Sequence, residues 1–80
     1  MKLLKLEKYN CAPCKMVESL LEDSGVDYDK VNIEDSPDVA MQYGVMGVPV
    51  VVLLDGDEEV ERVVGFDPPK IMGLINKVES

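Results

Sequence analysis

Hydrophobic residues recur along this chain with two different spacings, and each spacing marks a predicted element. Residues 2–7 form a short apolar stretch with Leu4 and Leu6 on one face, which indicates a strand. Residues 12–24 carry apolar side chains at helical spacing, and Gly25 is a natural stop for that helix. The apolar stripe of this predicted helix consists of Met16, Val17, Leu20 and Leu21.

The central part of the chain predicts an outer strand followed by a short helix. In residues 28–33, Val31 and Ile33 face inward, and the aspartate and lysine of the same stretch suit an outer position in a sheet. Ser36-Pro37-Asp38 combines a hydroxyl cap, a proline at the first helical position and an acid near the positive helix end. We expect this helix to end at Gly44.

The C-terminal half predicts a hairpin and a last helix. Pro49 opens a dense apolar run over residues 50–54, of the kind found in buried strands. Asp55-Gly56 turns the chain, and residues 60–64 return as the hairpin partner. The last helix follows Gly65-Phe66-Asp67-Pro68. Its apolar residues recur at helical spacing and are Ile71, Leu74, Ile75 and Val78.

The order of these elements, β-α-β-α-β-β-α, predicts a single α/β domain over residues 1–80. The first βαβ unit should be a right-handed crossover with parallel strands, and the hairpin adds two further strands. We therefore expect a four-stranded mixed sheet flanked by helices on both faces. Residues 2–7 and 50–54 are the most apolar strands, so they should be central.

Composition narrows the classes of partner. Eight basic against sixteen acidic residues give a net charge of −8, which disfavours binding to nucleic acid or anionic lipid. The N-terminus is too short and too charged for a signal peptide, and no stretch approaches the roughly 20 apolar residues of a spanning helix. We expect a soluble, cytoplasmic monomer. Because aromatic residues are scarce, the packing should rest on valine, leucine, isoleucine and methionine. The methionines expected as core filler are Met16, Met41, Met46 and Met72, with a place lining a substrate groove as the alternative for Met46.

The only two cysteines lie three residues apart in Cys11-Ala12-Pro13-Cys14, between the first strand and the first helix. With Asn10 as the helix cap, Cys11 occupies the first helical position, where backbone N–H groups and the helix dipole favour its thiolate. Cys14 lies one turn further and should be less exposed. Cys11 is therefore the predicted nucleophile and Cys14 the residue that resolves its adduct as a disulfide.

Two other interpretations of the pair stay open. A structural disulfide closing so short a loop contributes only about 2 kcal/mol in the chain-entropy model. A metal site needs four ligands, and this chain has two cysteines and no histidine. Only a dimer could complete such a set, for example by sharing an iron–sulfur cluster. For the redox interpretation we expect neither a cofactor nor a metal.

Four motifs in this order resemble the thioredoxin and glutaredoxin superfamily. They are Cys11-Ala12-Pro13-Cys14, Gly47-Val48-Pro49 before a buried strand, the Asp55-Gly56 hairpin, and Val63-Val64-Gly65 before the last helix. The match covers nearly the whole chain and implies a minimal thioredoxin fold. It also implies a protein-disulfide reductase that is itself reduced by a thioredoxin-reductase-like donor. A glutathione-dependent glutaredoxin and an electron donor to ribonucleotide reductase are the alternatives within redox chemistry.

The resemblance also implies roles for residues outside the cysteine pair. Pro49 should follow a cis peptide bond, so that the backbone of Val48 can pair with an extended substrate segment. Pro13 should stiffen the motif, because it lacks an N–H where the helix needs none. Gly65 either contacts substrate or belongs to the loop before the Asp67 helix cap.

The sequence departs from the family at two positions near the motif. Lys5 stands where the family has a buried aspartate, and Asn10 stands where it has tryptophan. With no histidine in the chain, proton transfer to or from Cys14 must use water, Glu7, Lys8 or Lys30, and Lys5 or Lys8 would favour a thiolate. The net charge and the absence of a basic cluster argue against glutathione as the reductant.

Overall fold

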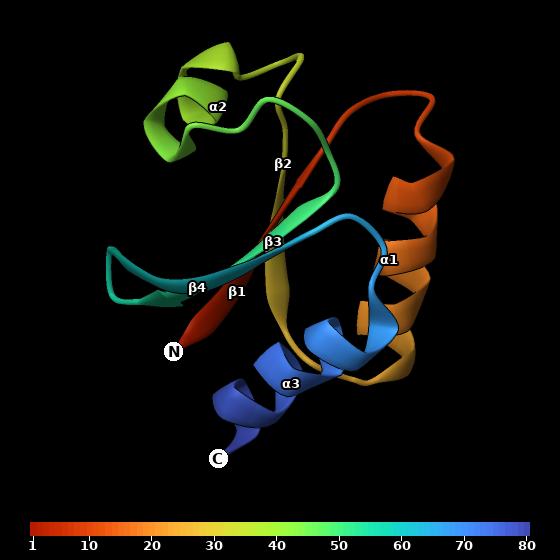
Figure 1. The fold of residues 1–80 in the computed structure, drawn as a ribbon, viewed down its shortest axis with the longest axis vertical. Helices are drawn as coiled ribbons and strands as arrows, with labels where there is room; N and C mark the ends of the chain where they lie inside the picture. Colours follow the sequence, from red (N-terminus) through yellow and green to blue (C-terminus); the bar gives the residue numbers. More distant parts are fainter.

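The computed structural model describes residues 1–80 and contains the seven predicted elements in the predicted order (Figure 1). The strands are β1 (Lys2–Glu7), β2 (Tyr28–Asn32), β3 (Val50–Asp55) and β4 (Glu58–Val64). The helices are α1 (Ala12–Asp23), α2 (Pro37–Tyr43) and α3 (Pro68–Glu79). No helix has the length and apolar character needed to cross a membrane.

The strands form one mixed sheet in the order β2-β1-β3-β4, which confirms that the two most apolar strands are central. β1 runs parallel to β2 and antiparallel to β3, and β3 pairs antiparallel with β4. Leu6 at the end of β1 pairs with Val50, the first residue of β3. This register brings the end of β1 and the start of β3 to the same edge of the molecule.

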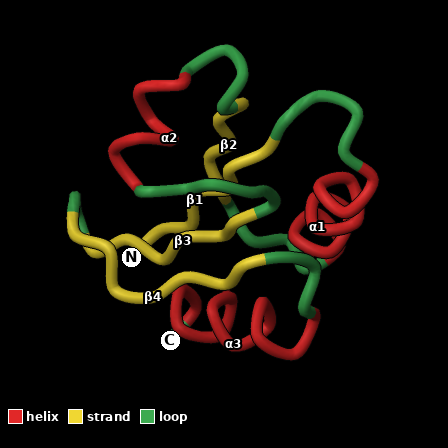
Figure 2. Tube along the Cα trace, turned by 45° about the horizontal axis from the view of Figure 1, so that its top comes forward, coloured by secondary structure: helices red, strands yellow, loops and turns green.

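Helices cover both faces of the sheet, as predicted. Figure 2 shows α2 on one side and α3 on the other, with α1 beside α3. The larger core lies under α1 and α3 and consists of Leu3, Val17, Leu21, Val51, Leu53, Val63, Ile71, Leu74 and Ile75. The smaller core lies under α2 and consists of Leu4, Leu6, Val50, Val52 and Leu54. The alternation of β1 therefore places Lys5, like Leu3, on the face that α1 covers.

Element boundaries differ from the predicted ones by a few residues at most. β2 ends at Asn32, one residue before the predicted end, and β4 begins at Glu58, two residues before the predicted start. A register shift between Leu53 and Leu54 accommodates this longer hairpin. Ser36 occupies the cap position of α2, but its side chain makes no capping hydrogen bond, so the predicted hydroxyl cap is wrong. Gly44 ends α2 in the left-handed conformation, φ +63°.

The prediction that methionines fill the core is wrong. All four predicted core methionines, Met16, Met41, Met46 and Met72, have exposed side chains. The apolar stripe of α1 is narrower than expected, because Val17 and Leu21 are buried while Leu20 is only partly buried. Branched aliphatic side chains from β1, β3 and the two long helices fill the available space without methionine.

Replacing Leu21 by alanine should lower the free energy of unfolding by about 2–5 kcal/mol, because it empties a fully buried position between α1 and the sheet. Met16→Ala, on the same helix, should change that free energy by no more than about 0.5 kcal/mol. Urea denaturation followed by circular dichroism measures both. Equal losses for the two variants would contradict the division of α1 into a buried and an exposed face.

Candidate active site

Three segments that are distant in the sequence meet at one end of the sheet. β1 ends at Glu7 and leads into the cysteine motif. Val50 pairs with Leu6 on one side and with Val64 on the other, so Pro49 and Gly65 lie at this same end. The Gly65 N–H donates a hydrogen bond of 2.8 Å to the Pro49 carbonyl. The sheet therefore fixes the motif, the proline loop and the glycine relative to one another.

The loop between β1 and α1 is tied to the segment after β2. The Tyr9 N–H donates to Glu34 Oε1 at 2.7 Å, and the Tyr9 hydroxyl donates to Asp35 Oδ2 at 2.6 Å. The hydrogen bond to Asp35, together with its negative charge, raises the pKa of Tyr9 above its usual value. Asn10 then takes a left-handed conformation, φ +53°, which asparagine tolerates better than most residues.

Cys11, and not Asn10, is the N-cap of α1. Cys11 has an extended backbone, φ −120° and ψ 101°, as a cap residue requires, whereas the left-handed Asn10 lies one position outside the helix. The Cys14 N–H donates to Cys11 Sγ at 3.2 Å. As the N-cap, Cys11 places its sulfur where a capping oxygen usually lies, at the positive end of the helix. This position favours the Cys11 thiolate, as predicted for the first helical position.

The structure holds the two cysteines as a disulfide. Their Cα atoms are 5.2 Å apart, within the range that an unstrained backbone offers a disulfide. Cys11 is 6% exposed and Cys14 is 3% exposed, so both sulfur-bearing residues are buried in this oxidised state and Cys14 is slightly the deeper. Pro13, at the second position of α1, is exposed beside them.

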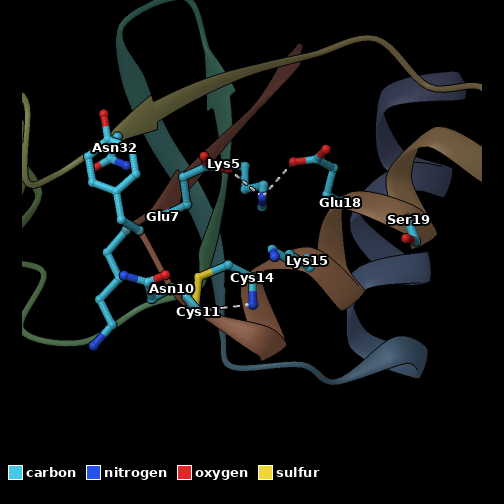
Figure 3. Close-up of a pocket in the computed structure, with 11 residues that line it drawn as sticks. Lys5, Glu7, Asn10, Cys11, Cys14, Lys15, Glu18, Ser19 and Asn32 are labelled. Atoms are coloured by element: carbon cyan, nitrogen blue, oxygen red, sulfur yellow. Dashed lines mark hydrogen bonds and ion pairs between the residues drawn. A yellow bond between two sulfur atoms is a disulfide. The ribbon is translucent and has the colours of Figure 1, made fainter.

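A pocket of about 710 Å³ opens next to the disulfide (Figure 3). Charged and polar side chains dominate its lining, which includes Lys5, Glu7, Lys8, Lys15 and Glu18 together with both cysteines. The Lys5 side chain lies between the disulfide region and Glu18 in this view. The structure thus brings Glu7 and Lys8, two of the predicted proton-transfer residues, to the cysteine pair. Lys30 does not line this pocket.

Four alternating charges form a chain that starts beside this pocket. Lys5 Nζ, on a side chain only 1% exposed, lies 2.5 Å from Glu7 Oε1 and 3.5 Å from Glu18 Oε2. Lys30 Nζ, which is half exposed, lies 3.3 Å from the same Glu18 oxygen. The hydrogen bond from Lys30, with the charges of Lys30 and Lys5, lowers the pKa of Glu18, and the same hydrogen bond raises the pKa of Lys30.

Glu18 is the member of this cluster that the sequence analysis missed. It lies four residues after Cys14 and therefore on the same face of α1. The spacing of four residues was the available signal, since it places the Glu18 side chain on the side of α1 that carries Cys14.

The proline loop presents a different surface at the same end of the sheet. The Val48–Pro49 peptide bond is cis, as predicted, and Pro49 is buried. The backbone of residues 46–48 makes no hydrogen bond within the chain. Three apolar side chains, Met46, Val64 and Phe66, are exposed around it. Val48, Pro49 and Gly65 do not line the pocket beside the cysteines.

The side chains of one copy do not assemble a metal site. No group of three or more His, Cys, Asp or Glu residues lies together in the way a metal ion requires. A metal or iron–sulfur carrier would have to draw its remaining ligands from a second copy of the chain.

Comparisons with known proteins agree with this geometry. The glutaredoxin family model matches residues 5–60. The SPbeta prophage-derived thioredoxin-like protein YosR of Bacillus subtilis is 47% identical over 79 residues, covering 98% of this chain and 99% of that protein. The thioredoxin of Chlamydia caviae is 44% identical over 73 residues, covering 84% of this chain and 72% of that protein.

Solved thioredoxin structures share the fold. The thioredoxin Mala s 13 of Malassezia sympodialis superimposes with a TM-score of 0.87 at 22% identity, covering 98% of this chain and 74% of that one. NaTrxh of Nicotiana alata superimposes with a TM-score of 0.81 at 32% identity, covering 94% and 70%. With a capped cysteine pair, a cis-proline loop and these relatives, the chain belongs to the thioredoxin and glutaredoxin superfamily of thiol-disulfide oxidoreductases.

Proposed function

We propose that this protein reduces disulfide bonds in target proteins by a dithiol mechanism, with Cys11 as the attacking residue and Cys14 as the resolving one. The hydrogen bond from the Cys14 N–H to Cys11 Sγ at the start of α1 is the observation that carries this proposal. It supplies a donor to the sulfur that would bear the negative charge. The Ala12 N–H, at the first position of α1, belongs to the N–H groups that have no partner within the helix, and Pro13 has no N–H.

The reaction consists of two thiol-disulfide exchanges, which together transfer two electrons from the protein to the target. The Cys11 thiolate attacks one sulfur of the target disulfide, and the other target sulfur leaves as a thiolate that takes a proton from solvent. Cys14 then loses its proton, attacks Cys11 Sγ and displaces the target as its second thiolate, which also takes a proton from solvent. The target has gained two electrons and two protons, and the protein has returned to the disulfide seen in the structure.

The proline loop is the proposed docking site for the target. The unpaired backbone of Val48 can exchange hydrogen bonds with an extended target segment, as in strand addition. Exposed Met46, Val64 and Phe66 offer apolar contact around it, and exposed Pro13 lies beside the reacting sulfur. The Gly65 N–H is already bonded to the Pro49 carbonyl, so Gly65 supports this loop and its N–H is not free for the target.

The proposed electron donor is a flavin-dependent thioredoxin reductase in a reducing cytoplasm, with the protein acting as a monomer. Glutathione is the second candidate. The pocket gathers Lys8 and Lys15 beside the disulfide, so the sequence-based view that basic residues do not cluster is too simple. Both lysines share that pocket with Glu7 and Glu18, however, and these carboxylates oppose binding of an anionic tripeptide.

Turnover of a disulfide-bonded protein substrate should be supported by a thioredoxin reductase with NADPH and not by glutathione with glutathione reductase. The expected difference in rate is at least about tenfold, which corresponds to 1.4 kcal/mol of transition-state stabilisation. NADPH oxidation at 340 nm measures both reactions with one substrate. Faster turnover with glutathione would replace the thioredoxin-type assignment by the glutaredoxin-type one.

Cys11→Ser should abolish reduction of the protein substrate, because a serine hydroxyl stays protonated at neutral pH and does not exchange with disulfides. Circular dichroism should show an unchanged fold, since the position is a helix cap that serine also suits. Substantial turnover by this variant would show that Cys11 is not the attacking residue.

Cys14→Ser should accumulate a covalent mixed disulfide between Cys11 and the target, because the resolving thiol is missing. Non-reducing electrophoresis and intact-mass spectrometry detect the adduct, and dithiothreitol should release it. The double variant Cys11→Ser/Cys14→Ser is the matched control and should form none. An adduct that forms with Cys11→Ser and not with Cys14→Ser would reverse the two roles.

A further inference from the structure

Lys5 is the one charged side chain that the structure buries. It lies on central strand β1, on the face covered by α1, and lines the pocket that contains Cys11 and Cys14. Its ammonium group pairs with Glu7 and Glu18, whose side chains are partly exposed. The most buried positive charge of the protein therefore lines the same pocket as its most buried cysteine.

This arrangement leaves one N–H of the Lys5 ammonium group without a hydrogen-bond partner. An ammonium has three N–H donors, and two point to Glu7 and Glu18 in the structure. The side chains of Glu7 and Glu18 are partly exposed, whereas Cys14 is only 3% exposed. In the disulfide state neither sulfur carries charge, so Lys5 is balanced by its two carboxylates alone.

Reduction of the Cys11–Cys14 disulfide allows a negative charge to form on Cys14. When the disulfide opens, Cys14 must pass through a thiolate before it can attack Cys11, and a buried thiolate without a nearby cation is disfavoured by desolvation. We propose that Lys5 is a positioning residue that stabilises the thiolate of Cys14 across their shared pocket and thereby speeds release of the target. This inference rests on the proposed function, because it concerns the second exchange of the same reaction.

Lys5 keeps its own proton throughout the proposed step. The Cys14 thiol gives its proton to solvent through the pocket, and the resulting thiolate forms the new bond to Cys11 Sγ. The bond between Cys11 and the target breaks, and its electron pair leaves with the target sulfur. Lys5 changes only the stability of the thiolate, which is why its removal should act on a pH profile.

Other charges face the same pocket and set the size of the effect. They are Glu7 and Lys8 from the end of β1 and Lys15 and Glu18 from α1. Lys30 of β2 does not line the pocket but pairs with Glu18, and the Tyr9 hydroxyl is bonded to Asp35. Without Lys5, the carboxylates of Glu7 and Glu18 would remain in the pocket that Cys14 lines. The local field would then oppose the thiolate that Lys5 favours.

The test follows alkylation of Cys14 by neutral iodoacetamide in the Cys11→Ser background, where Cys14 is the only thiol. Adding Lys5→Met should raise the midpoint of the rate against pH by about one unit or more and slow alkylation at pH 7 about tenfold. Adding Lys5→Arg keeps the positive charge and should restore most of the rate. Because no target is reduced in this measurement, its outcome is independent of whether the proposed function is correct.

Lys30→Met is the matched control, since Lys30 lies beside Lys5 in the register of β1 and β2 and pairs with the same Glu18. Its side chain is 52% exposed, so solvent screens its charge and the midpoint should move much less. An unchanged midpoint in folded Lys5→Met would overturn the proposal, as would an equal shift in Lys30→Met.

A second measurement applies if Lys5→Met does not fold. In the Cys11→Ser protein with Lys5 intact, the side-chain nitrogen resonance of Lys5 should shift at the pH at which Cys14 titrates, because the two charges interact. Cys11→Ser/Cys14→Ser should lose that inflection. A Lys5 resonance that does not shift when Cys14 titrates would overturn the proposal, and this test requires no substitution of Lys5.

Discussion

The pairing of β1 with β3 is the constraint on which the site depends. It places the end of β1 beside the start of β3, and the apolar side chains on both faces of these strands hold that register in place. A slip of one residue would turn Lys5 toward the α2 side and its neighbours Leu4 and Leu6 toward α1. The cysteine motif, the proline loop and Gly65 meet at one end because this central pair does not slip.

At that end, the helix contributes its electrostatics through an unusual cap. Cys11 occupies the position that serine, aspartate or asparagine usually takes, and its sulfur accepts the N–H that a capping oxygen would accept. One contact therefore serves both the helix and the chemistry. The Cys14 N–H, which is capped by Cys11 Sγ at the start of the helix, is also the donor that stabilises a Cys11 thiolate. Left-handed Asn10, held in a loop tied to Glu34 and Asp35 through Tyr9, turns the chain into this geometry.

The sequence predicted the architecture well because its signals are local. Alternation in residues 2–7, the apolar run at 50–54 and the helix-start patterns each depend on neighbours in the chain, and the motifs identify the family. The exposed methionines were not predicted, because a helical stripe does not show which of its edges meets solvent. The cap at Cys11 was missed because the backbone of Asn10 is set by tertiary contacts. The ion pair of Lys5 with Glu18 joins residues thirteen apart in the sequence, so it could be recognised only from the fold.

The burial of Lys5 is hard to explain by stability alone. Burying an ion pair costs desolvation that its attraction often fails to offset, and an apolar side chain at position 5 would extend the core that Leu3 and Val51 already form on that face. The fold therefore has no evident need of a charge there. The one nearby group whose charge changes during the reaction is the cysteine pair, and Lys5 shares its pocket. While the disulfide is closed, Glu7 and Glu18 balance the charge of Lys5. When the disulfide opens, the same charge can stabilise a cysteine thiolate, and this role accounts for a buried lysine at position 5.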